Sequence, residues 1–395
     1  MHKTMKTDGL KPVWKVWRFD QIATNVNARI DNPSESGMEH YVGLEHLDAD
    51  SLRIRRWGSP SDVEATKLCF KVGDIIFGKR RAYQRKLGVA EFDGICSAHA
   101  MVLRPKPSVV IPEFLPFFMQ SELFMNRAIE ISVGSLSPTI NWKTLATQVF
   151  SLPPVNEQLT LVTVMKSFDT AIDAHVTALA SSLALVNSLR EEIFGIEAKP
   201  RVLGDLLSDI QAGKSLLGMN QSPSSTEKAV LKVSAVGKDG FLPNESKVLL
   251  EQDQFLSLHA VKNGDVLITR ANTPDLVGMV CLVEGDYQNL MLCDKTLRLV
   301  PDTGISGLLL AECLKTQNSR RYLSANATGT GGAMKNISQA KIRSMPVNYP
   351  SKAMAAKAEK GLLAAIAASR SVQARLLSIR NMRKAVLAEF AAREV

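Results

Sequence analysis

The stretch Lys71-Val-Gly-Asp-Ile-Ile-Phe-Gly-Lys79 returns later in the chain as Lys262-Asn-Gly-Asp-Val-Leu-Ile-Thr-Arg270. Each copy has the pattern of a Gly-Asp turn, a short apolar strand and a cation where the strand ends. Downstream of both copies, further matches follow in the same order: Gly88-Val89-Ala90 with Gly278-Met279-Val280, Met101–Pro105 with Leu297–Pro301, and Leu152-Pro153 with Tyr349-Pro350. Several matches in one order indicate that the chain contains a duplicated unit.

Each copy of the unit ends in a long segment with heptad spacing. In the first copy the seam positions, spaced alternately by four and three residues, are Leu161, Met165, Phe168, Ile172, His175, Leu179, Ser182, Val186, Leu189 and Ile193. In the second copy they are Leu362, Ala365, Ser369, Val372, Leu376, Ile379, Arg383, Val386 and Phe390. Such seams predict two helices, the first about 60 Å long, that pair with one another. The alternative is two unrelated helical hairpins inside one larger core.

The predicted fold class is α+β, with two mixed α/β domains in tandem repeat, separated by two long helices pairing as an antiparallel coiled coil. The predicted boundaries are 1–153 for the first domain, 154–198 for the first helix, 199–350 for the second domain and 351–395 for the second helix. Short strands between Gly and Pro turns, together with a helical stretch from Pro112 to Ile131, give each domain its mixed character.

The composition excludes several classes of protein. With 395 residues, 45% hydrophobic and 22% charged, the chain matches ordinary globular domains and neither disordered nor collagen-like sequences. No apolar run approaches the roughly 18 residues of a membrane span, so we expect no membrane partner. The N-terminus lacks the apolar core of a signal peptide, and the five cysteines form no C-x-x-C pair. We therefore expect a cytoplasmic protein with reduced thiols.

Fragments that resemble catalytic motifs fail on inspection. Gly213-Lys214-Ser215 resembles the end of a phosphate-binding loop, but Ser208 stands where the motif requires glycine. A nuclease centre would need Asp173, Glu197 and Lys199, of which Asp173 lies inside the first predicted long helix. The six histidines have no metal-ligand spacing. We therefore predict no catalytic, cofactor-binding or metal site in this chain.

Basic residues gather where the chain would meet a phosphate backbone. The formal net charge is +9, and residues 79–86 contain five cations, one tyrosine and no acid. Guanidinium groups form bidentate hydrogen bonds with phosphate or guanine edges, and glycines with Ser, Thr and Asn let a backbone approach phosphate closely. The candidate DNA-binding residues are Lys79, Arg80, Arg81, Tyr83, Arg85, Lys86, Ser135, Ser137, Thr139, Asn141, Arg270, Asn272, Thr273, Thr328, Thr330, Lys335 and Asn336. Solvated basic loops and flexible turns remain the alternative for these segments. Arg53, Arg55 and Arg56 form a third, weaker cluster.

The order of these parts resembles the specificity (S) subunit of type I restriction-modification enzymes. The resemblance lies in Gly73–Arg81, Gly88–Ala90 and Met101–Pro105, and in Ile140 through Leu152-Pro153-Pro154-Val155-Asn156-Glu157-Gln158 before the first long helix. The second unit departs from the pattern, since Arg343–Pro350 lacks the Pro-Pro-x-x-Glu-Gln ending.

The resemblance implies two target recognition domains, each of which reads one half of a bipartite DNA site. It also implies that the paired helices set the gap between the halves and dock two methylation subunits, and restriction subunits through them. These partners would supply the chemistry, with S-adenosylmethionine for methylation and ATP with Mg for restriction, and this chain would bind no cofactor. Double-stranded DNA would be its own ligand.

Two other classes of function stay open on the sequence alone. One is a single-chain nuclease or methyltransferase with an unrecognised site, which would show turnover in isolation. The other is a coiled-coil DNA-bridging protein, which would bind without sequence preference. The recognised sequence, the gap length and the presence of cleavage in the complex do not follow from these patterns.

Overall fold

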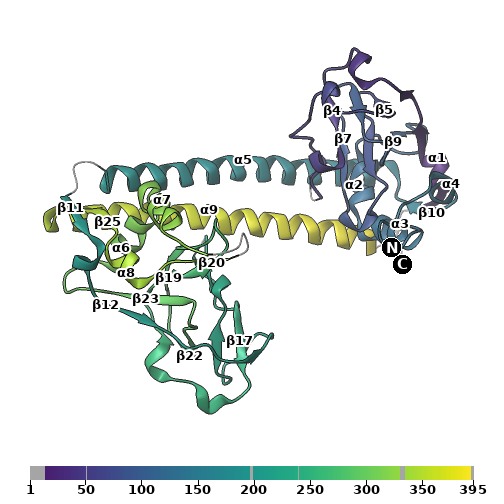
Figure 1. Cartoon of the computed structure of the whole chain (residues 1–395). Coiled ribbons are helices and arrows are strands. Elements are labelled where there is room, and N and C mark those ends of the chain that lie inside the picture. The colour runs from purple at the N-terminus through teal and green to yellow at the C-terminus, as the bar shows by residue number, and fades with distance from the viewer. Residues whose placement is uncertain (1–13, 50, 196–198, 239, 330–333, 393–395) are drawn as a thin grey trace, which may run out of the picture. The chain divides into compact units, whose positions relative to one another are not determined.

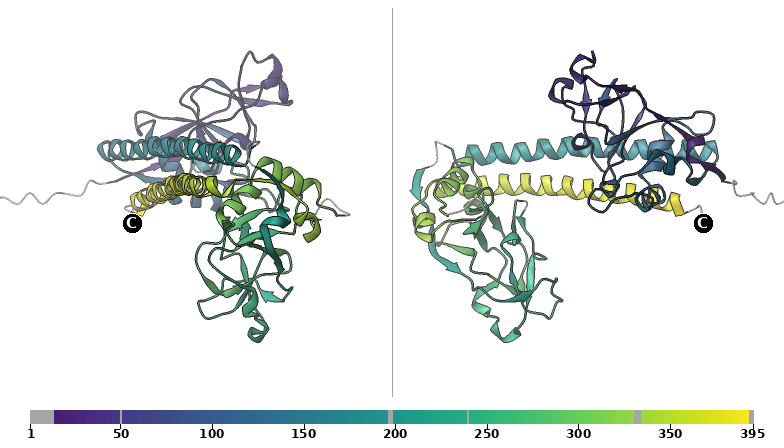
Figure 2. Two further views of the ribbon diagram at one scale, coloured as in Figure 1. Left: turned by 90° about the vertical axis from the view of Figure 1, so that its left-hand side faces the viewer. Right: turned by 45° about the vertical axis from the view of Figure 1, so that its right-hand side comes forward.

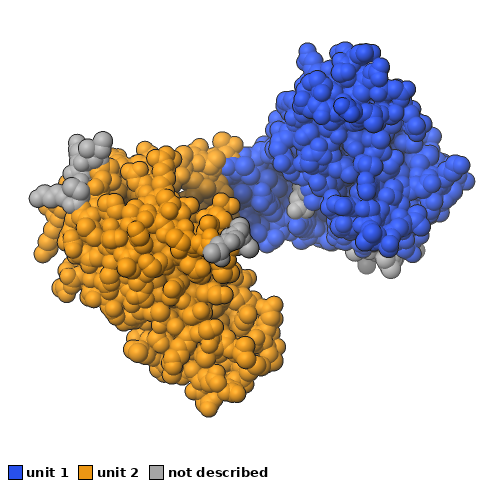
Figure 3. Space-filling model, viewed as in Figure 1, with its two compact units in different colours: residues 1–176, 374–395 blue, residues 177–373 orange. Residues whose placement is uncertain are grey.

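A computed structural model of the chain describes residues 14–49, 51–195, 199–238, 240–329 and 334–392. The chain forms two compact units, shown in Figure 3. Unit 1 comprises residues 1–176 and 374–395, and unit 2 comprises residues 177–373. Each unit therefore includes half of each long helix.

Unit 1 is built on two four-stranded sheets (Figure 1). The first is antiparallel, in the order β2 (Ala23–Val26), β9 (Ala100–Pro105), β6 (Ile75–Gly78) and β7 (Leu87–Val89). The second has the order β3 (Arg29–Ile30), β5 (Lys67–Phe70), β8 (Gly94–Cys96) and β4 (Tyr41–Val42). A separate pair joins β1 (Lys15–Arg18) to β10 (Val149–Leu152). Strand β6 is buried along its whole length, as its uninterrupted apolar run predicts.

Short helices close the core of unit 1. They are α1 (Phe19–Ile22), α2 (Phe114–Gln120), α3 (Glu122–Glu130) and α4 (Trp142–Ala146). The helical stretch predicted from Pro112 to Ile131 contains two helices, α2 and α3, because the chain breaks at Ser121. Ser121 has extended backbone angles, and its hydroxyl caps α3 by accepting a hydrogen bond from the N–H of Phe124. The break lets both short helices bury phenylalanines in one core.

Unit 2 repeats the four-stranded first sheet of unit 1, and its second sheet has five strands. Its first sheet has the order β12 (Leu207–Ala212), β23 (Thr296–Pro301), β19 (Val266–Thr269) and β21 (Val280–Leu282). Its second has the order β13 (Gly218–Met219), β17 (Ser246–Leu249), β14 (Ala229–Leu231), β22 (Tyr287–Met291) and β18 (Ala260–Val261). The smaller elements are β11 (Lys199–Val202), β15 (Val236–Gly237), β16 (Gly240–Phe241), β20 (Ala271–Asn272), β24 (Lys335–Asn336), β25 (Pro346–Tyr349), α6 (Gly307–Leu314), α7 (Gln317–Ala325) and α8 (Gln339–Arg343). The predicted duplication is confirmed by the strand order of the first sheets.

The Gly-Asp turn has the same structural role in both copies. Asp74 is 1% exposed, and its Oδ2 accepts a hydrogen bond from the N–H of Lys71 at 2.9 Å. Asp265 accepts the equivalent bond from Lys262 at 2.9 Å. Each carboxylate also pairs with an arginine of the neighbouring strand, Arg104 in unit 1 and Arg298 in unit 2. The motif therefore fixes the start of β6 and β19, the strands that lead into the candidate loops.

The two long helices are α5 (Val155–Ile193) and α9 (Lys352–Ala392). Every predicted seam position is buried or half-buried, including the polar ones. Within unit 1 the first half of α5 lies beside the second half of α9, and within unit 2 the remaining halves lie side by side (Figures 1 and 2). In unit 1 the buried Arg383 of α9 donates to Asp169 of α5 at 2.8 Å and to Gln120 at 2.8 Å. The predicted fold class, two mixed α/β units in tandem with two long helices, is confirmed.

Both long helices are long and apolar enough to cross a membrane by length and composition alone. This criterion averages hydropathy over a window, whereas the expectation from the sequence concerns uninterrupted apolar runs. Alanines between the seam residues raise the mean hydropathy of both helices, although polar residues interrupt every apolar run. One or two such helices are weak evidence for a membrane protein.

Candidate nucleic-acid interface

The basic loop of unit 1 connects β6 to β7 and has a defined shape. It contains a single 3-10 turn at Ala82–Gln84, flanked by Arg81 and Arg85 in left-handed conformations (φ 56° and 52°). Ala82 is 1% exposed and anchors the turn in the core of unit 1. Because Ala82 anchors the turn in the core, the side chains around the turn are held in fixed positions at the surface.

The cations of this loop have different surroundings. Arg85 donates to both carboxylate oxygens of Glu122, at 2.5 and 2.6 Å, and this bond holds the pKa of Glu122 below its usual value. Lys86 donates to the carbonyl of Leu44 at 2.6 Å. These two side chains therefore hold the loop to its own domain. Arg81 and Tyr83, by contrast, are exposed.

The second candidate segment of unit 1 is joined to the first through the backbone. The N–H of Arg81 donates to the carbonyl of Pro138 at 2.7 Å, and the N–H of Ile140 donates to the carbonyl of Lys79 at 2.9 Å. Two segments about sixty residues apart in the sequence thus form one surface. Local composition indicates each segment as a candidate, whereas their pairing arises only in the folded chain.

The predicted residues in this second segment are of two kinds. Asn141 caps α4 by accepting from the N–H of Lys143 at 3.0 Å, and Thr139 donates to the carbonyl of Ser137 at 3.0 Å. Ser135 lies at the exposed tip, beside Leu136, which is 91% exposed. The tip is therefore the part of this segment that presents free surface to a ligand.

Unit 2 joins its two candidate segments in the same way. The N–H of Ile337 donates to the carbonyl of Arg270 at 2.8 Å, the counterpart of the bond between Ile140 and Lys79. From there, β20 pairs with β24, which places Asn272 opposite Lys335 and Ala271 opposite Asn336. The backbone N–H of Thr328 donates to the carbonyl of Asn336, and the N–H of Asn336 donates to the carbonyl of Thr328.

The remaining predicted residues of unit 2 are placed as follows. Asn272 accepts from the N–H of Thr273 through its own Oδ1 at 2.8 Å, and Lys335 donates to the carbonyl of Gly329 at 3.4 Å. Thr273 and Thr328 are exposed. Thr330 lies outside the described residues. The predicted residues of unit 2 that the structure describes thus all lie where the segments 270–273 and 328–336 meet, as in unit 1.

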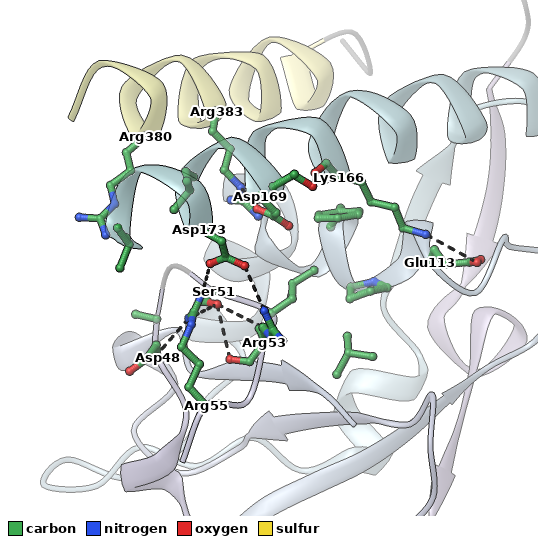
Figure 4. A pocket seen from close by; sticks show the side chains of 18 of the residues that line it. Asp48, Ser51, Arg53, Arg55, Glu113, Lys166, Asp169, Asp173, Arg380 and Arg383 are labelled. Carbon is green, nitrogen blue, oxygen red and sulfur yellow. Dashed lines mark hydrogen bonds and ion pairs between the residues drawn. The ribbon is translucent and has the colours of Figure 1, made fainter. Parts of the chain in front are cut away.

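The third arginine cluster is engaged inside unit 1. Arg53 and Arg55 donate to Asp173 of α5 at 3.3 and 2.7 Å (Figure 4). Arg56 donates to Asp48 at 2.5 Å. These residues, Arg56 excepted, line a cleft of about 1170 Å³ together with Lys166, Arg380 and Arg383. The cluster therefore attaches the domain to α5, and its charge is balanced by acids. It also occupies Asp173, the residue that a nuclease centre would have required.

The chain is similar to a protein-family model, to curated proteins and to solved structures. Residues 62–180 match the family model described as the type I restriction modification DNA specificity domain. The chain is 33% identical over 158 residues to the type I restriction enzyme EcoEI specificity subunit of Escherichia coli, a match that covers 39% of this chain. That match spans 26% of the length of the relative.

Solved structures with the same fold cover almost the whole chain. A type I restriction-modification system S subunit from M. genitalium superposes with a TM-score of 0.60 at 13% identity, covering 98% of both chains. A chain from a study of complex assembly and conformational transition of the type I R-M system superposes with a TM-score of 0.58 at 18% identity, covering 97% of this chain and 98% of the other. These structures show that the chain shares their fold, and the family model with the curated relative confirms the resemblance to type I specificity subunits.

Proposed function

We propose that this chain, which carries a type I restriction modification DNA specificity domain at residues 62–180, is the DNA-sequence-recognition subunit of a type I restriction-modification complex. The observation that carries the proposal is the repeated joint, at which a strand-end cation, Lys79 or Arg270, meets the Ser/Thr/Gly segment ahead of the long helix. The joint occurs once in each unit, on the same strand of the same sheet. Two such surfaces suit a DNA site with two halves.

Each unit would read one half of a bipartite site. The two joints have the same backbone frame and carry different side chains, with Arg81 and Tyr83 in the first and Asn272 and Lys335 in the second. Because sequence is read by side chains at base edges, different side chains on one frame give two different half-sites. The site would therefore be asymmetric in sequence.

The long helices would set the gap between the half-sites and dock two methylation subunits, and restriction subunits through them. In this arrangement the methylation subunits carry S-adenosylmethionine and the restriction subunits use ATP with Mg. This chain positions those enzymes on double-stranded DNA, works in the cytoplasm and performs no chemistry itself. The relationship to a protein named as a specificity subunit supports this division of roles.

The test is single-molecule methylome sequencing of the host with and without the gene, its methylation subunit being present. Loss of one bipartite, asymmetric methyl-adenine motif is the expected result and would supply both half-sites. An unchanged methylome in a host whose methylation subunit is expressed would contradict the proposal. Turnover of DNA by the isolated chain would favour an enzyme, and binding without sequence preference would favour a bridging protein.

A further inference from the structure

Three cations and one histidine gather at one end of the first sheet in unit 1. Arg29 is the first residue of β3, shortly after β2 ends, His99 precedes β9, and Lys79 with Arg80 follows β6. Since β9 is antiparallel to both of its neighbours, the ends of β2 and β6 and the start of β9 lie at one edge. Of these residues, only Lys79 and Arg80 belong to the basic run in the sequence.

These side chains crowd one another. The guanidinium of Arg80 lies 3.0 Å from Nε2 of His99, and because a guanidinium only donates, this nitrogen accepts and the imidazole is neutral. Burial, together with Arg80 and Lys79, lowers the pKa of His99, and burial, together with Arg29, lowers the pKa of Lys79. Within the described part of the chain, none of the four forms an ion pair with a carboxylate.

Unit 2 repeats this arrangement with other residues. Lys214 lies just beyond the end of β12, Lys295 precedes β23, and Arg270 follows β19, so the same three strands of the first sheet each contribute a cation at the same edge. All three lack a carboxylate partner among the residues that the structure describes. Asp294 precedes Lys295, which gives this cluster the smaller excess of positive charge.

Gly213 explains why Lys214 reaches this edge. A Cβ at position 213 would lie 2.0 Å from the carbonyl oxygen of Leu292, so only glycine lets the chain pass here. The N–H of Lys214 then donates to that carbonyl at 3.3 Å. Glycine at position 213 therefore allows a close contact between two backbone segments. This contact places Lys214 at the ends of the strands.

Like charges held together without an acid are stabilised by an anion. We propose that these two strand-end clusters, Arg29, Lys79, Arg80 and His99 in unit 1 and Lys214, Arg270 and Lys295 in unit 2, each hold a backbone phosphate of duplex DNA. Phosphate contacts fix the register of a protein on the duplex, while neighbouring side chains read the bases. The clusters adjoin the joints at Lys79 and Arg270, so each unit has an anchor beside its reading surface. This inference rests on the proposed function.

The test compares variants of the full chain that remove the same amount of charge from opposite ends of the sheets. R29Q/K79Q removes two cations from the first cluster, and K214Q/K295Q removes two from the second. The matched control is K71Q/K262Q, since Lys71 and Lys262 are exposed cations that precede β6 and β19. Binding of a labelled duplex of random sequence is measured by fluorescence anisotropy across a range of salt concentrations, after thermal unfolding has verified that each variant folds.

Each cluster variant should lose on the order of tenfold in affinity, and the slope of log K against log salt should fall by about 0.9 for each phosphate contact removed. The control should change neither quantity. If the wild type binds and the cluster variants have the same affinity and salt slope as the control, this inference is overturned and the proposed function stays intact. A wild-type chain that binds no duplex would instead remove both.

A second readout separates phosphate from base contacts. The methylated motif of the host should stay the same in each cluster variant, with only the extent of methylation reduced. A changed motif with an unchanged salt slope would assign these side chains to base reading and overturn the phosphate assignment.

Discussion

The carboxylate of Asp74 accepts two hydrogen bonds from the guanidinium of Arg104, at 2.7 and 2.8 Å. The same carboxylate caps its own turn and is almost fully buried. Removing a partner from a buried charge leaves that charge uncompensated. We therefore expect R104Q to lower the free energy of unfolding by about 2 kcal/mol, measured by urea denaturation. The exposed change K71Q is the control, and an R104Q chain as stable as K71Q would contradict the expectation.

A second prediction concerns the seam between the long helices in unit 1. Arg383 is 6% exposed and pairs with Asp169, so D169N would leave a buried guanidinium without its carboxylate. We expect D169N to destabilise the protein by about 2–3 kcal/mol, and R383M/D169N to recover much of that loss because methionine fills the site without charge. A double-mutant cycle with R383M measures the coupling. Additive single effects would show that the pair contributes no coupling.

The basic loop of unit 1 should separate into two classes of arginine. R80Q/R81Q should weaken DNA binding and flatten its salt dependence, with the melting temperature unchanged. R85Q should instead lower stability by roughly 1 kcal/mol, because it releases Glu122 and the turn at Ala82–Gln84. Anisotropy and thermal unfolding on the same samples distinguish the two effects. Equal loss of binding in R80Q/R81Q and R85Q, without loss of stability in R85Q, would place Arg85 at the interface.

The stability of unit 2 should depend on Glu312 at acidic pH. Burial alone would raise the pKa of this carboxyl, but Lys315 and Arg190 outweigh burial and hold the pKa below its usual value of 4.5. The carboxylate therefore contributes stability that is fully present above pH 4.5 and is lost as the pH falls through the lower folded-state value. E312Q should lower the free energy of unfolding on the order of 1–3 kcal/mol at pH 7.

The gap between wild type and E312Q should close as the pH falls below 4.5. Urea denaturation of both proteins at several pH values from neutral to acid measures this gap. A constant difference across the series would show that the ion pairs of Glu312 do not titrate with folding.

The features that the sequence predicts correctly are periodic or repeated ones. The Gly-Asp copies at Lys71 and Lys262 and the two heptad seams follow from local spacing, and spacing survives folding. The helical stretch predicted from Pro112 to Ile131 is helical, but its apolar pattern does not reveal the break at Ser121, whose hydroxyl caps α3. Caps act at single residues, which a window of composition does not resolve.

The sequence predicts only those parts of the candidate interface whose charged residues are close together along the chain. Arg85 belongs to a basic run in the sequence, but its partner Glu122 is 37 residues away, so no local pattern indicates that the cation is engaged. Arg29 and His99 are isolated in the sequence and become neighbours of the run only through the pairing of β2, β9 and β6. Topology, rather than composition, decides which cations share an edge.

Phe390 of α9 lies against Trp14 and Phe114, with ring centroids 5.3 and 5.8 Å apart. Unit 1 thus takes part of its core from residues that are synthesised after all of unit 2. During translation the strands of unit 1 would wait, with that apolar surface uncovered, until α9 emerges. Unit 1 begins before unit 2 in the chain and is completed after it, so a nonsense mutation within the second half of α9 would remove part of the core of unit 1.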